Sequence, residues 1–370
     1  MAEPTGLLRR IARTLGGEDI IDALVRMPPR DLKSLLLHVF ERRAEHLTPL
    51  DLLTQYESTP AFAPSFAEPR VSTTFQHAAF AAADLFEAIE LSQLCPLGTM
   101  HVLAGIHQNN VLSASRGGEV VADPTPVIAL ECARRRRHPQ DRARPLRLCT
   151  SRRVMRMQPV PVPGLLPHFS LFAMATAGQK APAFETEELR QHLEVYLRLF
   201  QSLGSQGFRL ADVAVDVSDT EAVEQRLTSA GVDLQEVRRS VRTRHFADPD
   251  ELIRQRGLAP LRGPVEDVLP ALGAFPAHLA ERLRELQVRV LDPLAATFPR
   301  VRVRLDLSRL EGLGYYVGSC VRISARAPSG DVFPLVDGGF TRWTQELLSD
   351  RSERFLITGI GSDLVCARFR

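Results

Sequence analysis

The chain has 370 residues, enough for two or three domains of roughly 100–200 residues each. Hydrophobic residues make up 44% of it and charged residues 24%, values typical of soluble globular proteins, and no run of about 18 apolar residues could span a bilayer. The formal net charge is +2, and the basic residues are almost all arginine, with lysine only at Lys33 and Lys180. Neither lysine follows a glycine-rich phosphate loop, which excludes P-loop nucleotide chemistry.

The N-terminus has no apolar stretch followed by a small-residue cleavage site, so we expect a cytoplasmic protein without a membrane partner. The cysteines are scattered without paired spacing, which indicates neither a disulfide framework nor a zinc site. We expect them to be small core residues, and we expect no metal ion and no cofactor. They are Cys95, Cys132, Cys149, Cys320 and Cys366.

Residues 1–68 are predicted to form an N-terminal helical domain. Apolar residues recur there at helical spacing, and Pro28 and Pro29 suit the start of a helix. Thr48 with Asp51 is typical of a capping box that opens another helix. The proline-rich stretch that follows interrupts the periodicity and marks the first boundary.

Residues 69–217 are predicted to mix helices and strands. Apolar residues alternate with period two in several segments and with helical spacing in others. The predicted elements are a helix at 75–88, strands across 99–125 joined by a turn at Gly117 and Gly118, a helix ending near 138, strands at 146–157 and 168–178, a helix at 184–203 and a strand at 208–219.

Residues 218–300 change character and are predicted to be a helical insertion, because five helical segments follow one another between Gly, Pro and Asp. Strands return in 301–370, which we take as the second part of the core that 69–217 begins. The predicted elements there are strands at 301–308, 315–325, 331–340 and 355–361 and a helix at 343–348. The pattern predicts an α+β fold, an antiparallel sheet flanked by helices with an N-terminal helical extension and a helical insertion.

Four segments carry recognisable patterns. GGEVVADPTPVIALECARR contains Asp123, Thr125 and Pro126, and RLCTSRRVMRM ends near Arg156. The third segment, GLLPHFSLFAMATAG, supplies an apolar frame. DLSRLEGLGYYVGSC with LVDGGF places Tyr315 and Tyr316 among glycines, and the chain closes on GIGSDL. In this order and spacing they resemble the core of class II aminoacyl-tRNA synthetases in its histidyl form.

The resemblance implies an antiparallel class II sheet, a homodimer built on the helix at 75–88 and its adjoining strands, and an amino-acid site. At that site it implies Asp123 and Thr125 beside the ligand's amino group and Arg156 at the arginine that holds the ATP α-phosphate. Tyr315 and Tyr316 would wall the pocket.

The sequence also departs from the synthetase pattern. Glu311 and Leu364 stand where the family has arginines that bind the activated carboxylate and ATP, and Gln158 and Ala175 replace two glutamates. Adenylate formation needs positive charge where phosphate charge develops. We therefore expect no catalytic residue and no ATP binding tighter than ~1 mM. The sequence ends at Arg370, and we expect no anticodon-binding domain.

A core without that domain resembles the regulatory subunit of ATP phosphoribosyltransferase, a histidine-biosynthesis paralogue of histidyl-tRNA synthetase. The first hypothesis is accordingly a noncatalytic regulatory or scaffold subunit that binds an amino acid or amine and a phosphoribosyltransferase-like partner enzyme. A second hypothesis is a divergent enzyme that activates a carboxylate or transfers an acyl group, with Arg156, Arg116 and Glu119 recruited to the cleft.

A third hypothesis is RNA binding. It depends on a cluster of arginines that could contact phosphates, although arginines at a helix end are also typical of a solvated surface. The cluster is Arg134, Arg135, Arg136, Arg137, Arg142, Arg144, Arg147, Arg152, Arg153 and Arg156. Polar residues on the strands predicted across 99–125 are a further candidate site, or else a polar edge or dimer seam. They are His101, His107, Gln108, Asn109 and Asn110.

Overall fold

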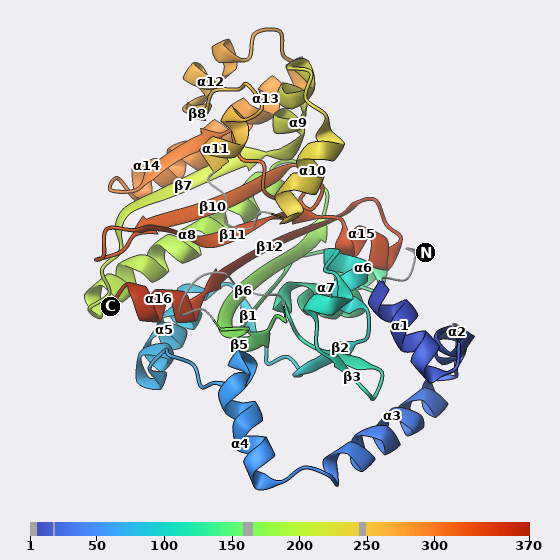
Figure 1. Ribbon diagram of the computed structural model, residues 1–370. Helices are drawn as coiled ribbons and strands as arrows, with labels where there is room; N and C mark the ends of the chain where they lie inside the picture. Colours follow the sequence, from blue (N-terminus) through green and yellow to red (C-terminus); the bar gives the residue numbers. More distant parts are fainter. Residues whose placement is uncertain (1–5, 18, 158–165, 244–248) are drawn as a thin grey trace.

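The computed structural model describes residues 6–17, 19–157, 166–243 and 249–370 (Figure 1). Its centre is a nine-stranded sheet in the order β1-β5-β6-β12-β11-β10-β7-β9-β8, antiparallel except for the pairs β1 with β5 and β7 with β9. The predicted antiparallel α+β fold is confirmed. The strands are β1 Glu87–Ala88, β5 Leu146–Met155, β6 His168–Gln179, β7 Ala211–Asp219, β8 Arg262–Gly263, β9 Arg302–Asp306, β10 Ser319–Arg326, β11 Val332–Thr341 and β12 Glu353–Gly361.

Helices cover both faces of this sheet. α5 (Pro69–Ala82), α8 (Phe184–Ser205) and α16 (Ser362–Arg368) lie against one face, and α7 (Pro124–Arg135) and α15 (Trp343–Leu348) against the other. The strands alternate accordingly. In β6, Phe172 and Met174 join the core under α8, whereas Ala173, Ala175 and Ala177 join the core under α7.

The interval predicted as a helical insertion is mostly helical, with the short strand β8 inside it, and lies at the top of Figure 1. Leu283 and Leu294 are fully buried in the same hydrophobic core as α8, so these helices extend that core. The elements are α9 Thr220–Ser229, α10 Leu234–Thr243, α11 Pro249–Arg254, α12 Val265–Ala271, α13 Ala277–Leu286, the π-helical turn η4 Gln287–Leu291 and α14 Asp292–Thr297.

The N-terminal arm, residues 6–58, consists of helices that project away from the sheet (Figure 1). Pro29 is the first residue of its third helix, and Thr48 and Asp51 form the predicted capping box. Ala12 is the one buried hydrophobic residue of the described arm, so most of its leucines remain exposed. The helices are α1 Gly6–Leu15, α2 Asp19–Arg26, α3 Pro29–Ala44 and α4 Pro49–Ser58, followed by the 3-10 turn η1 Pro60–Phe62.

The helix predicted at 75–88 is shifted. α5 begins at Pro69, because the Glu68 carboxylate accepts hydrogen bonds from the first backbone amides, and it ends at Ala82. Glu87 and Ala88 form β1 instead, paired in parallel with β5.

The strands predicted across 99–125 are mostly wrong. His101 lies in a helix, α6 (Thr99–Ala104), and Gln108, Asn109 and Asn110 form a 3-10 turn, η2. Only a small sheet is present, β2 (Leu94–Pro96), β3 (Ser113–Ala114) and β4 (Gly118–Val120), with the predicted turn between β3 and β4. The polar residues of this stretch therefore do not lie on buried strands.

All five cysteines are unpaired and buried, as predicted for core residues. Within the described residues no group of three or more His, Cys, Asp or Glu side chains is placed to hold a metal ion. Nor does any described helix combine the length and apolar character that crossing a membrane requires.

Candidate functional site

Asp123 lies where the chain leaves β4 and enters α7. Its Oδ1 accepts hydrogen bonds from the Thr125 backbone amide at 2.9 Å and the Thr125 hydroxyl at 2.8 Å, which caps the helix. Arg156 follows β5 and donates from Nη2 to Asp123 Oδ2 at 3.0 Å and from Nε to the Ala122 carbonyl at 2.9 Å. Both Asp123 oxygens are therefore engaged, and a ligand cation would have to share this carboxylate.

Tyr316 is packed between two glycines. A Cβ at Gly312, where φ is +92°, would lie 2.5 Å from Tyr316 Cδ2, and a Cβ at Gly339 would lie 2.8 Å from the same ring. Only glycine leaves room for the tyrosine at these positions. The ring is thereby fixed, and its hydroxyl donates to Asp337 Oδ1 at 2.6 Å.

Tyr315 completes an aromatic group with Tyr316 and Trp343. Its ring is nearly perpendicular to both, with centroids 4.8 Å and 5.8 Å away. Burial raises the pKa of Tyr315 well above its ordinary value, and the nearby Asp123 carboxylate raises it further while Arg156 opposes this. The structure therefore brings together the predicted residues Asp123, Thr125, Arg156, Tyr315 and Tyr316, which we call the Asp123 face.

Arg309 and Asp337 belong to this neighbourhood, and the sequence analysis missed them as site residues. Arg309 is buried beneath the Tyr316 ring, and its Nη2 donates to both Asp337 oxygens, at 3.0 and 2.8 Å. Asp337 is half-exposed. The alternation of side chains along a strand could have indicated Asp337, because it lies two residues before Gly339 on β11 and so shares the same face of the sheet.

The acidic groups of this region are matched by arginines. Glu311, which stands at one of the family's arginine positions, has its Oε2 3.4 Å from Arg322 Nη2. The negative charge of Glu311 is therefore offset by this arginine. Leu364 supplies no positive charge at the family's other arginine position, and its side chain packs against the hydrophobic core.

Glu119 is the centre of a second cluster. Its buried carboxylate accepts hydrogen bonds from the Gly98 and Met100 backbone amides at 2.9 and 2.8 Å and from Gln108 Nε2 at 3.0 Å. This arrangement stabilises the start of α6 and explains why a helix forms there. Arg116, at the β3–β4 turn, and Asn109 are exposed.

Most of the arginine cluster has acidic partners within the chain. Arg136 pairs with Glu353 and is buried, and Arg147 pairs with Glu188 at 2.6 Å. Glu131, Asp350, Asp363 and Asp123 neutralise others, whereas Arg137 and Arg144 are exposed. His168 is a hydrogen-bonded strand residue, with Nε2 2.7 Å from the Ala63 carbonyl oxygen. Few of these cations remain free for phosphates.

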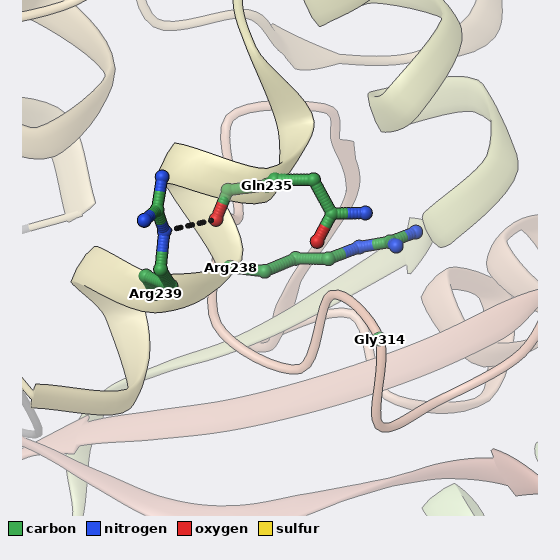
Figure 2. Close-up of a pocket in the computed structure, with 4 residues that line it drawn as sticks. All are labelled: Gln235, Arg238, Arg239 and Gly314. Atoms are coloured by element: carbon green, nitrogen blue, oxygen red, sulfur yellow. Dashed lines mark hydrogen bonds between the residues drawn. The ribbon is translucent and has the colours of Figure 1, made fainter.

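A cavity of about 180 Å³ lies between α10 and the loop that carries Tyr315. Gln235, Arg238, Arg239 and Gly314 line it (Figure 2). Arg238 extends across Gly314 and pairs with Glu224 at 2.5 Å. The sequence predicted α10 only as one helix of the insertion, with no site residue on it.

No protein-family model and no curated protein matches the sequence. Solved structures do match the fold. An ATP phosphoribosyltransferase regulatory subunit/histidyl-tRNA synthetase from Bacillus halodurans is 19% identical with a TM-score of 0.61, covering 83% of this chain and 81% of that one. A histidine–tRNA ligase subunit from Alicyclobacillus acidocaldarius is 16% identical with a TM-score of 0.59, covering 83% of this chain and 95% of that one.

Histidyl-tRNA synthetase from Nostoc is 17% identical with a TM-score of 0.60, and the alignment covers 83% of this chain and 74% of that one. The chain therefore has the class II fold in its histidyl-tRNA synthetase-like form, as the sequence patterns indicated. Identities this low establish the fold and leave function to the geometry of the site.

Proposed function

We propose that this protein is a noncatalytic member of the synthetase-like fold, a cytoplasmic regulatory or scaffold subunit that binds an amino acid or amine at the Asp123 face. One similar structure carries the name ATP phosphoribosyltransferase regulatory subunit, which supports a phosphoribosyltransferase-like partner enzyme and a role in histidine biosynthesis. The exposed apolar residues of the N-terminal arm support contact with another protein chain, because monomers rarely expose such extensive apolar surface.

The observation that carries this proposal is the balance of charge around Tyr315. Asp123 is matched by Arg156, Asp337 by Arg309 and Glu311 by Arg322. A triphosphate needs surplus positive charge, whereas a zwitterion carries one charge of each sign and can share a matched pair. The face therefore favours an amino acid over ATP.

Substituting Asp123 tests the ligand site. We expect Asp123→Asn to abolish the thermal shift given by the best-binding amino acid or amine, since the Oδ2 charge that would meet the ammonium is lost. The unliganded melting temperature should stay within a few degrees, because asparagine caps a helix nearly as well. Differential scanning fluorimetry across the amino acids and simple amines measures both quantities.

Asp219 provides a matched control. It also caps a helix, α9, and pairs with an arginine, Arg282, at 2.6 Å, but it is fully buried. Asp219→Asn should lower the unliganded melting temperature and keep the ligand shift. A ligand shift that survives in Asp123→Asn would place the site elsewhere.

The second hypothesis, a divergent carboxylate-activating enzyme, makes the opposite prediction about ATP. We expect calorimetry with ATP and Mg²⁺ to find no dissociation constant below ~1 mM, about −4 kcal/mol, because the charge near Tyr315 is balanced and Leu364 supplies no cation. Pyrophosphate exchange across amino acids and carboxylates should give no signal. Micromolar ATP affinity would support the enzyme instead.

A homodimer is expected, built on α5 and the adjoining strands, as two-fold dimers are the commonest assemblies. Light scattering should give about twice the chain mass of 41.1 kDa at micromolar concentration. Leu85, just after α5, is 55% exposed, and Leu85→Glu should shift the protein toward monomer. Val332→Glu, at a similarly exposed residue (54%) on β11, should leave the mass unchanged. A monomeric wild type would contradict this prediction.

A further inference from the structure

A cavity of about 530 Å³ lies along the open edge of β5, away from the residues of the Asp123 face. β1 pairs with β5 only at Leu148 and Cys149, so the described chain provides no strand partner beside residues 150–154 on this side. The cavity lies between this edge, the start of α5 and the segment that follows β1, so it borders the surface on which we expect the homodimer. Its lining residues are Pro64, Ser65, Ala67, Pro69, Ser72, Thr73, Gln76, Glu90, Gln93, Ser151, Arg152, Arg153 and Ser170.

Arg152 is the unusual member of this lining. Arg152 is only 4% exposed, and its Nη1 donates to the carbonyls of Leu91 and Ser92 at 2.7 and 2.8 Å. Nε and Nη2 are buried and have no partner. Across the described residues, no carboxylate lies within ion-pair distance of Arg152, although Glu90 lines the same cavity.

An unpaired buried charge is costly, and buried arginines are normally matched by an anion. Burial lowers the pKa of Arg152, and the more distant Glu90 only partly opposes this. The other buried arginines described above, Arg136 and Arg309, each have a carboxylate. Nε and Nη2, the two nitrogens along one edge of the Arg152 guanidinium group, therefore have neither a hydrogen-bond acceptor nor a counter-charge among the described residues.

The rest of the lining fits an oxyanion. Ser151 Oγ is buried without a partner and the Ser170 hydroxyl lines the same cavity, whereas the Ser72 and Thr73 hydroxyls already donate to the Glu68 and Pro69 carbonyls. Two nitrogens on one guanidinium edge match two oxygens of a phosphate or carboxylate, and hydroxyls supply further donors. The volume lies within the range of small-molecule sites.

We propose that this cavity is a second ligand site that binds the oxyanion group of a small molecule, a phosphate or a carboxylate, through Arg152 Nε and Nη2. It is independent of the proposed amino-acid site, since none of its lining residues belongs to the Asp123 face. The chain would thus bind two ligands at two separate sites on one sheet.

Isothermal titration with inorganic phosphate and, separately, with acetate tests the proposal and distinguishes the two oxyanions. Wild type should bind one equivalent of at least one of them with a dissociation constant near or below ~1 mM. Arg152→Gln should weaken this binding at least ~10-fold, since the charge is removed. Arg144→Gln, at an exposed arginine outside the cavity, is the matched control and should bind as wild type.

Folding is a separate readout. Glutamine is two bonds shorter than arginine and does not reach the Leu91 and Ser92 carbonyls, so a lower unliganded melting temperature of Arg152→Gln is expected from these two lost hydrogen bonds alone. Arg152→Lys keeps the charge without the planar fork and should bind with intermediate affinity. If Arg152→Gln fails to fold, this lysine variant decides the matter by its affinity.

Three outcomes would overturn the proposal. One is equal oxyanion affinity in wild type and in the Arg152 variants. Another is the absence of phosphate and acetate binding up to about 20 mM, more than tenfold above the expected constant. The third is that Arg152→Gln dissociates a dimer that itself binds neither ion, which would make the cavity an interface between two copies.

Discussion

Replacing Glu353 with alanine is expected to lower the free energy of unfolding by about 3–5 kcal/mol. Arg136 and Glu353 side chains are 1% and 0% exposed, and Arg136 Nε and Nη2 donate to the two Glu353 oxygens at 3.1 and 3.0 Å. The alanine variant leaves the guanidinium buried with only the Arg144 carbonyl as a partner. This pair joins the end of α7 to the start of β12, so its loss should loosen the layer that carries Asp123.

Urea denaturation of Glu353→Ala and of Glu131→Ala makes the comparison. Glu131 also bonds two arginines, Arg134 and Arg135, but at the surface of α7, where an ion pair contributes at most ~1 kcal/mol. The double variant Arg136→Met with Glu353→Leu should recover much of the loss, because no buried charge remains unpaired. Equal losses in the two single variants would contradict this account.

The strands of the sheet could be predicted because each one shows its own alternation of side chains in the local sequence. β6 alternates, with Phe172 facing α8 and Ala173 facing α7, and that period of two is legible without any structure. The helix α6 could not be predicted in the same way. Its start is held by Glu119, 19 residues beyond Met100, so a tertiary contact overrides the local pattern.

The same distinction applies to the site. Asp123 and Thr125 are two residues apart, so the helix cap that they form depends on local sequence alone. Arg309 and Asp337 are 28 residues apart, and Arg136 and Glu353 are 217 apart. No spacing rule connects such pairs, so the arginine cluster read as a candidate phosphate surface while its partners lay elsewhere in the chain.

The stability of the protein should fall steeply as the pH is lowered below about 6.5, because His192 is buried in its neutral form. Its Nε2 lies 2.9 Å from Thr176 Oγ1 and its Nδ1 lies 2.8 Å from Thr358 Oγ1, under α8. Burial lowers the pKa of His192 to about 3, and the Arg147 charge adds to this. The hydroxyls satisfy a neutral imidazole and offer no counter-charge to an imidazolium.

The direction follows from proton uptake. Between pH 6.5 and 3 this histidine is protonated in the unfolded chain and neutral in the folded chain. The free energy of unfolding therefore falls by up to about 1.4 kcal/mol per pH unit as the pH is lowered. At pH 4.5 the loss from this one group is about 2–3 kcal/mol. Urea denaturation at pH 7, 5.5 and 4.5 gives the free energy of unfolding at each pH. This free energy should fall less steeply with falling pH in His192→Gln, whose amide can bond both threonines without titrating. His77→Gln, at an exposed histidine on α5, should keep the slope of wild type, and a wild-type slope in His192→Gln would show that other groups govern the acid sensitivity.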